Sequence, residues 1–154
     1  PLEFADLHDR AALRWGGGKL EARIAWDGKE QAAALDAIVF APAAAVGEHA
    51  HPGAWECLMP LRAAGEVIVA GAPQAVVPGV ATCIPPDVKH AWKPAGTEPL
   101  VAIQFYAPAG AEQRFRDLAT QELDAAAAAG APPAAAAPPV GAPAPGAPAK
   151  GPSR

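Results

Sequence analysis

The chain has 154 residues, enough for one ordinary domain, and its 12 basic and 16 acidic residues give a formal net charge of −4. All 16 acidic residues lie at or before Asp124, and ten of the basic residues lie in the same segment, so residues 1–124 carry a net charge of −6. An acidic domain without a basic stripe argues against nucleic acid and anionic membranes as partners. No apolar run approaches the roughly 20 residues of a membrane span.

Short strands separated by turn residues dominate the chain up to Pro108. Residues 20–26, ended by Asp27 and Gly28, predict one or two edge strands that cover the rest of the sheet. The further strands expected in chain order span residues 37–40, 66–70, 75–77, 81–84 and 100–106. Strands at intervals of about 8 to 12 residues are typical of an antiparallel sandwich or barrel, so the sequence predicts an all-β fold.

A helical pattern follows the last expected strand. Residues 111–128 are rich in helix formers. The apolar stripe on this otherwise charged segment consists of Phe115, Leu118, Ala119 and Leu123. Because an amphipathic helix needs burial to be stable, we expect it to pack on the exterior of the barrel rather than to bind a partner. The helix should end near Gly130.

The C-terminal segment differs in composition from the rest of the chain. From Ala125 onward the chain is almost wholly Ala, Pro and Gly, and it contains eight prolines that neither helix nor sheet accommodates. The predicted organisation is therefore a β-barrel with N-terminal edge strands over residues 1–108, a C-terminal helix over 109–130 and a disordered or polyproline-like tail over 131–154.

Three of the four histidines and Glu56 fall into two short blocks, residues 47–56 and 79–90. Imidazole nitrogens and a carboxylate oxygen suit first-row divalent metals such as iron, manganese, copper, nickel or zinc, whereas calcium and magnesium prefer oxygen ligands. His49 and His51 are two residues apart, so on a strand their side chains point to one face. Glu56 follows at an odd offset, and the turn dipeptide Pro52-Gly53 can return its carboxylate toward the imidazoles on the next strand.

The first block resembles the first motif of the cupin superfamily. That motif is a glycine, five residues, His-x-His, three or four residues, Glu, six residues and a glycine. His49, His51 and Glu56 match it. The opening glycine is replaced by Ala43, and the closing glycine is displaced to Gly65.

The second block resembles the second cupin motif, which runs from a glycine through Pro-x-Gly to a histidine and an asparagine. Gly79, Pro85 and His90 match it at the family's spacing. Asp87 and Pro94 stand in place of the second glycine and the asparagine. None of the substituted residues in either block is a metal ligand in the motif.

The resemblance spans roughly residues 37–108 and implies a cupin jelly-roll β-barrel. It also implies one divalent first-row transition metal ion, of unknown identity, held by His49, His51, Glu56 and His90. The alternative is a cupin barrel in which these residues no longer bind metal, because an isolated His-x-His is most often exposed or hydrogen-bonded.

Strand parity indicates further residues of the pocket. Trp92 lies two residues past His90, and Gln104 and Tyr106 lie two apart on the last expected strand. We predict that Trp92, Gln104 and Tyr106 line the pocket, where they can hydrogen-bond a ligand or orient a histidine. The alternative is that Gln104 and Tyr106 face solvent and Trp92 is part of the core.

The predicted function follows from a metal with an open coordination position, which separates a catalytic centre from a structural one. Cupins with this ligand set include dioxygenases, isomerases, decarboxylases and lyases, so the resemblance does not select a reaction. The expected pocket has apolar walls and no acid or base other than Glu56, which favours redox or Lewis-acid chemistry.

We therefore expect a small metal-dependent enzyme, an oxygenase or related oxidoreductase, that acts on a small organic molecule. The first alternative is a non-catalytic module that binds a metal or a small ligand. The second is a barrel without metal that has a structural or carbohydrate-binding role.

The cysteines and the chain ends bear on the cellular compartment. The sequence does not decide whether Cys57 and Cys83 pair, and two unpaired core thiols are the more common outcome. The first residue is Pro1 rather than Met, and the C-terminal segment is rich in Ala and Pro, so we expect an exported protein, periplasmic or secreted, with a cytoplasmic one as the alternative. The β-rich N-terminus offers an edge through which a homodimer would form.

Overall fold

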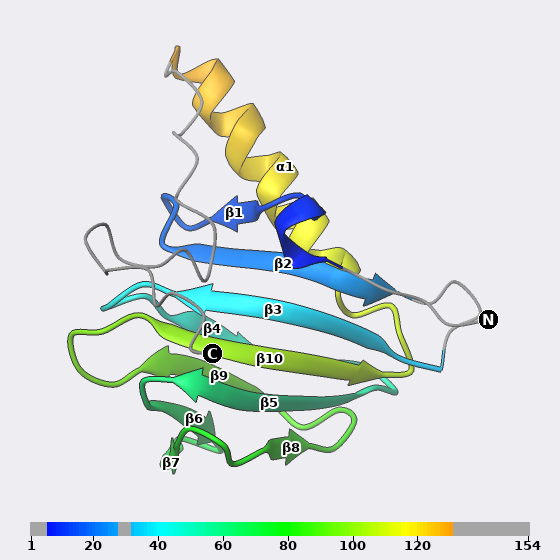
Figure 1. The fold of residues 1–154 in the computed structure, drawn as a ribbon, viewed down its shortest axis with the longest axis vertical. Helices are drawn as coiled ribbons and strands as arrows, with labels where there is room; N and C mark the ends of the chain where they lie inside the picture. Colours follow the sequence, from blue (N-terminus) through cyan, green and yellow to red (C-terminus); the bar gives the residue numbers. More distant parts are fainter. Residues whose placement is uncertain (1–5, 28–31, 131–154) are drawn as a thin grey trace, which may run out of the picture.

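The computed structural model describes residues 6–27 and 32–130 (Figure 1). The elements of these segments are, in chain order, the 3₁₀ helix η1 (Leu7–Asp9), the strands β1 (Leu13–Trp15), β2 (Leu20–Asp27), β3 (Ala34–Phe40), β4 (Val46–His49), β5 (Trp55–Arg62), β6 (Gly65–Val69), β7 (Ala72–Val76), β8 (Thr82–Ile84), β9 (His90–Pro94) and β10 (Leu100–Ala107), and the helix α1 (Gln113–Ala128). The tail expected over residues 131–154 lies outside the described residues. No helix in the described segments is long and apolar enough to cross a membrane.

Two antiparallel sheets form the body of the molecule (Figure 1). One sheet has the strand order β1-β2-β3-β10-β5-β8 and the other has the order β4-β9-β6-β7. The inward side chains of both sheets form one core that includes Phe40, Leu58, Val67, Trp92 and Tyr106. This arrangement confirms the predicted all-β barrel of jelly-roll type.

The segment expected to form one or two edge strands, residues 20–26, forms the single strand β2, which is not at an edge. β2 pairs with β1 on one side and with β3 on the other, so β1 is the edge strand at this end of the sheet. Glu21 and Arg23 of β2 are buried because the N-terminal segment lies over them: Arg23 donates hydrogen bonds to the carbonyls of Leu7 (3.2 Å) and Arg10 (2.9 Å).

The helix α1 ends where the sequence predicted, with Gly130 in a left-handed conformation at φ 67°. Its position differs from the expected exterior packing. Phe115 stacks on Trp15 of β1 with ring centroids 5.4 Å apart, and both belong to the core between the sheets. α1 packs against β1, the strand at one edge of the six-stranded sheet (Figure 1). Leu123, expected in the apolar stripe, is 60% exposed because the second half of α1 runs past β1 (Figure 1).

Close packing and backbone conformation describe three positions at which the chain departs from the cupin motifs. Gly65 must be glycine, because a Cβ at this position would lie 2.8 Å from the Lys93 carbonyl oxygen and 2.7 Å from Leu100 Cδ1. Ala43 and Asp87, which replace motif glycines, adopt left-handed conformations with φ of 61° and 66°. The turns therefore keep a conformation that glycine adopts most easily, although both residues carry a side chain.

Cys57 and Cys83 form a disulfide, so the expectation of unpaired thiols is wrong. The two residues are direct partners across β5 and β8, and their Cα atoms are 4.0 Å apart. The sequence could not show this pairing, because β5 and β8 are joined by β6 and β7 of the other sheet. Alternation along β5 places Cys57 on the face opposite to Glu56.

Candidate metal centre

Four side chains converge between the two sheets. His49 is the last residue of β4, His51 lies in the following turn, Glu56 is on β5 and His90 begins β9. Their candidate ligand atoms all lie within 4.8 Å of one another. The structure thus brings together the four residues that the sequence singled out.

The local chain path explains this convergence. His49 and His90 are direct partners across β4 and β9. His51 lies beyond the end of β4, so its position comes from the turn rather than from the parity of a regular strand. The Ala54 amide donates to the His51 carbonyl at 3.3 Å, and this turn returns the chain so that Glu56 points back at the imidazoles.

Backbone carbonyls fix the orientation of two of the histidine rings. His49 Nδ1 lies 2.8 Å from the Gly47 carbonyl oxygen, and His90 Nδ1 lies 2.9 Å from the Val88 carbonyl oxygen. A carbonyl oxygen can only accept, so Nδ1 carries the proton in both rings and Nε2 faces the cluster. Metal-binding histidines characteristically donate their other N–H group in this way.

The two oxygens of the Glu56 carboxylate have different neighbours. Oε1 accepts hydrogen bonds from Trp92 Nε1 at 2.7 Å and from Gln104 Nε2 at 2.6 Å. Oε2 lies 3.0 Å from His90 Nε2, 2.6 Å from His51 Nε2 and 3.9 Å from His49 Nε2. Two buried donors therefore fix the carboxylate while its second oxygen faces all three imidazoles.

The environment of His51 Nε2 indicates whether a metal ion fits this cluster. This nitrogen is buried and close to Glu56 Oε2, but the angle is not that of a hydrogen bond and the atom has no hydrogen-bond partner in the described part of the chain. A buried polar atom without a partner costs about 1–3 kcal/mol. A cation bound by this nitrogen would remove that cost, and the set of three imidazoles and one carboxylate fits a first-row divalent metal.

The protonation states of the cluster also suit a metal. Burial would raise the pKa of Glu56, but the close His51 nitrogen and the hydrogen bond with His90 outweigh it and lower this pKa to about 2. Burial lowers the pKa of His49 to about 4. The pKa of His90 is raised, because its hydrogen bonds to Glu56 and to the Val88 carbonyl outweigh burial. At neutral pH Glu56 is thus charged and His49 neutral, which are the states in which a carboxylate and an imidazole bind a metal ion.

Comparison with known proteins identifies a domain within the chain. The family model of the cupin domain matches residues 37–106, which include both histidine blocks. The chain carries a cupin domain. A search of curated proteins found no match.

Solved structures share the fold of this cupin at low sequence identity. KdgF from a Halomonas species is 17% identical with a TM-score of 0.63, and the match covers 73% of this chain and 99% of that one. A predicted oxalate decarboxylase from Thermotoga maritima is 16% identical with a TM-score of 0.61, and the match covers 69% of this chain and 99% of that one. A cupin 2 conserved barrel domain protein from Salinispora arenicola CNS-205 is 24% identical with a TM-score of 0.58, and the match covers 76% of this chain and 98% of that one. Each likeness shows the fold alone.

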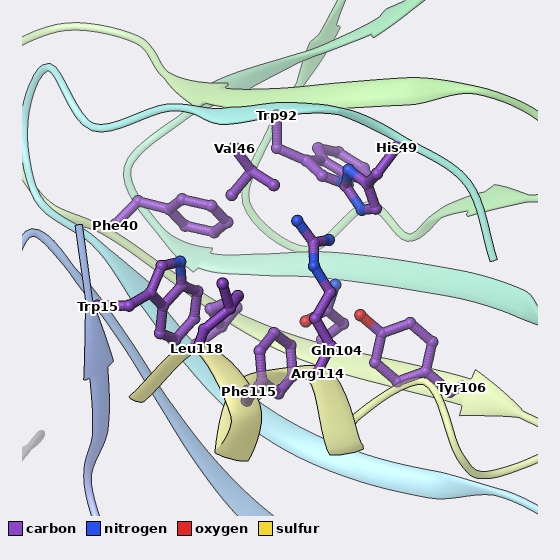
Figure 2. Close-up of a pocket in the computed structure, with 11 residues that line it drawn as sticks. Trp15, Phe40, Val46, His49, Trp92, Gln104, Tyr106, Arg114, Phe115 and Leu118 are labelled. Carbon is purple, nitrogen blue, oxygen red and sulfur yellow. The ribbon is translucent and has the colours of Figure 1, made fainter. Parts of the chain in front are cut away.

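A pocket of the cupin barrel lies beside the cluster (Figure 2). His49, Trp92, Gln104 and Tyr106 line its polar side. The apolar side consists of Trp15, Ile38, Phe40, Val46, Phe115 and Leu118. Burial raises the pKa of Tyr106 well above its ordinary value, so the phenol keeps its proton at neutral pH. Sequence analysis missed Trp15 and the residues of α1, because no sequence pattern shows that the helix closes this end of the barrel.

A second buried carboxylate was also missed. Asp36 of β3 is 1% exposed, and neither of its side-chain oxygens has a hydrogen-bond partner in the described segments. It lies directly across from Gln104 of β10, whose Oε1 is likewise unpartnered. Burial, followed by the negative charge of Glu112, raises the pKa of Asp36 to about 8. The one available signal was an acidic residue within the apolar run of residues 34–40.

Proposed function

We propose that His49, His51, Glu56 and His90 bind one divalent first-row transition metal ion, and that the protein is a small metal-dependent enzyme, an oxygenase or related oxidoreductase acting on a small organic molecule. The convergence of the four ligand atoms within 4.8 Å carries this proposal. When bound, the metal would supply Lewis acidity, redox capacity and a coordination position open to the substrate.

The residues around the cluster support this assignment. Trp92 and Gln104 hold Glu56 in position through its Oε1 atom. The apolar residues of the pocket exclude bulk water from the site, which strengthens electrostatic interactions inside it.

The pocket also favours redox or Lewis-acid chemistry over proton shuttling. Outside the cluster, the titratable side chains among its described lining residues are Tyr106 and Arg114. The Tyr106 phenol stays protonated at neutral pH because burial raises its pKa, and a guanidinium group does not give up its proton in proteins. Neither group is suited to serve as a general base.

The size of the pocket favours a second candidate, a non-catalytic module that binds a metal or a small ligand. The space open to the centre of a water-sized molecule is about 10 Å³, which is room for about one water molecule. A metal-binding module needs no more space than this, whereas an enzyme must make room for its substrate.

Elemental analysis tests the metal site. We expect the purified protein to retain one metal ion per chain, and we expect His49→Ala and His90→Ala to lose it. His8→Ala is the matched control, because His8 is exposed and pairs only with Asp6 in the described segments. Wild-type protein that retains no metal after incubation with each first-row divalent ion would contradict the proposal. Oxygen uptake with candidate substrates then separates the enzyme from the binding module.

We also infer that the protein is exported, either to the periplasm or into the medium. The Cys57–Cys83 disulfide supports this inference, because disulfides persist in oxidising compartments and are rare in the cytosol. We expect to find the protein in the periplasmic fraction or the medium of the source cells, and a thiol titration of that protein should find no free thiol. Recovery of the protein in the cytosolic fraction with two free thiols would contradict the inference that it is exported.

A further inference from the structure

The side chain of Arg114 lies beside the histidine cluster and has no partner among the residues that the structure describes. Its side chain is half-buried and lines the pocket together with His49, Trp92 and Gln104. Figure 2 shows the guanidinium group pointing from α1 into the space between these residues. In the described segments this group forms no hydrogen bond and no ion pair.

Other arginines show that this is unusual in the molecule. Ion pairs with N–O distances of 2.7 to 3.3 Å join Arg14 and Arg23 to Glu21, Arg62 to Glu98 and Arg116 to Asp27. Arg10 also lacks an ion pair in the described part, but it is exposed to water. A half-buried guanidinium loses hydration and gains nothing in return unless a carboxylate pairs with it.

The acidic residues nearest to Arg114 along α1 do not neutralise it. Glu112 accepts a hydrogen bond from the Gly110 amide at 2.6 Å, and Asp117 accepts one from Gln113 at 3.3 Å. Among the described residues no carboxylate therefore pairs with Arg114, whose side chain lines the same pocket as His49.

Charge balance indicates what this site takes up. A divalent ion together with the Glu56 carboxylate carries a net charge of +1, and Arg114 raises the charge around the pocket to +2. The described residues that line the pocket include no carboxylate. An anionic ligand is therefore favoured over a neutral one of the same shape.

We infer that Arg114 binds the carboxylate of a small anionic ligand whose second oxygen donor faces the histidine cluster. This inference rests on the proposed metal site and makes small carboxylates the substrate class. A guanidinium group matches a carboxylate through two parallel hydrogen bonds. Because the pocket has room for about one water molecule, the ligand has few atoms and takes space that the flexible Arg114 side chain now fills.

Binding of glycolate and glycolamide to the metal-loaded protein tests this inference. The two probes share their shape, the hydroxyl group and one carbonyl oxygen, but glycolamide has a neutral NH2 group where glycolate has its second carboxylate oxygen. Isothermal titration calorimetry should show that Arg114→Met weakens glycolate binding by about 10-fold to 100-fold, as expected for a charge-assisted pair. The glycolate affinity of Arg114→Lys should lie between those of the wild type and Arg114→Met, because an ammonium group keeps the charge but not the planar geometry of the guanidinium group. Glycolamide binding should not change in either variant.

Arg116→Met is the matched control. It removes the same charge two residues along α1, but Arg116 pairs with Asp27 and does not line the pocket. Glycolate affinity in this variant should stay within about twofold of the wild type.

The outcomes separate the two proposals. Elemental analysis comes first: a wild type without metal contradicts the proposed function and the present inference together. If wild type and Arg114→Met retain equal metal but bind glycolate equally, or if neither binds it, only the role of Arg114 is overturned. Equal weakening of glycolate by Arg114→Met and Arg116→Met would overturn it as well, since net charge alone would then explain the effect.

Discussion

Two buried carboxylates in one barrel are held in opposite protonation states. Glu56 and Asp36 are each 1% exposed, and burial pushes the pKa of both upward. Glu56 has partners on both oxygens, and its pKa falls to about 2. Asp36 has no hydrogen-bond partner in the described segments, and its pKa rises to about 8. Partners rather than depth of burial therefore decide which carboxylate is charged, and only the charged one is suited to bind a cation.

The largest expected effect is a difference in metal affinity between the two variants in which one carboxylate is replaced by its amide. Glu56→Gln removes the charge that faces three imidazoles, so metal affinity should fall by more than about 100-fold, beyond the usual effect of losing a supporting residue. Asp36→Asn should change affinity only a few-fold, because Asp36 is neutral below a pKa of about 8. Competition with a chromophoric chelator measures both. Similar losses in the two variants would mean that Asp36 is charged and acts on the metal.

The pH dependence of stability distinguishes the same two residues. The pKa of Asp36 is about 8 in the folded protein against an ordinary value of 3.8, so the folded state holds a proton that the unfolded state releases. Stability is thus highest below the ordinary value and falls as the pH rises toward 8. Asp36→Asn should match the wild type near pH 4 and exceed it at pH 8 by a few kcal/mol, on the order of the linked free energy.

Urea unfolding at a series of pH values measures this difference. Glu56→Gln gives the opposite sign, because the folded-state pKa of Glu56 lies below its ordinary value. Its wild-type contribution is present above the ordinary value and is lost as the pH falls toward 2. A difference between Asp36→Asn and wild type that stays constant with pH would show that Asp36 titrates normally.

Sequence analysis found Glu56 but not Asp36, and the reason is physical. Glu56 carries a local signal, because a turn joins His51 to Glu56 and both residues offer donor atoms of types that bind metals, although His90 joins them only through the pairing of β4 with β9. The state of Asp36 depends on the pairing of β3 with β10, which places it beside Gln104, 68 positions later in the chain. No local spacing encodes that pairing.

The same distinction explains the other differences between prediction and structure. The strands, the end of α1 and the antiparallel fold follow from local patterns. The Cys57–Cys83 disulfide, the burial of Arg23 and the place of α1 over the pocket depend on how distant segments dock. Leu123 matches the helical period, yet it is exposed because α1 extends beyond the sheet it covers.

Removing a hydrogen-bond donor to Glu56 should have the next smaller effect on metal affinity. Gln104→Met keeps the volume of the side chain but removes the donor that lies 2.6 Å from Glu56 Oε1. Metal affinity should fall by about 10-fold to 100-fold, because the carboxylate loses one of its two supports. Gln74→Met is the control, since Gln74 is exposed on β7. An unchanged affinity would mean that Trp92 alone fixes the carboxylate.

The smallest expected effect concerns the second cause of the raised Asp36 pKa. After burial, the negative charge of Glu112 is the strongest influence that keeps Asp36 protonated. Glu112→Gln keeps an oxygen that can accept from the Gly110 amide but removes this charge, so the pKa of Asp36 should fall from about 8 toward its ordinary value without reaching it. Carbon-detected NMR titration of the Asp36 carboxyl follows the change directly. A shift to the ordinary value would mean that charge, not burial, controls Asp36, and the contrast with Glu56 would then be one of neighbouring charges rather than of hydrogen-bond partners.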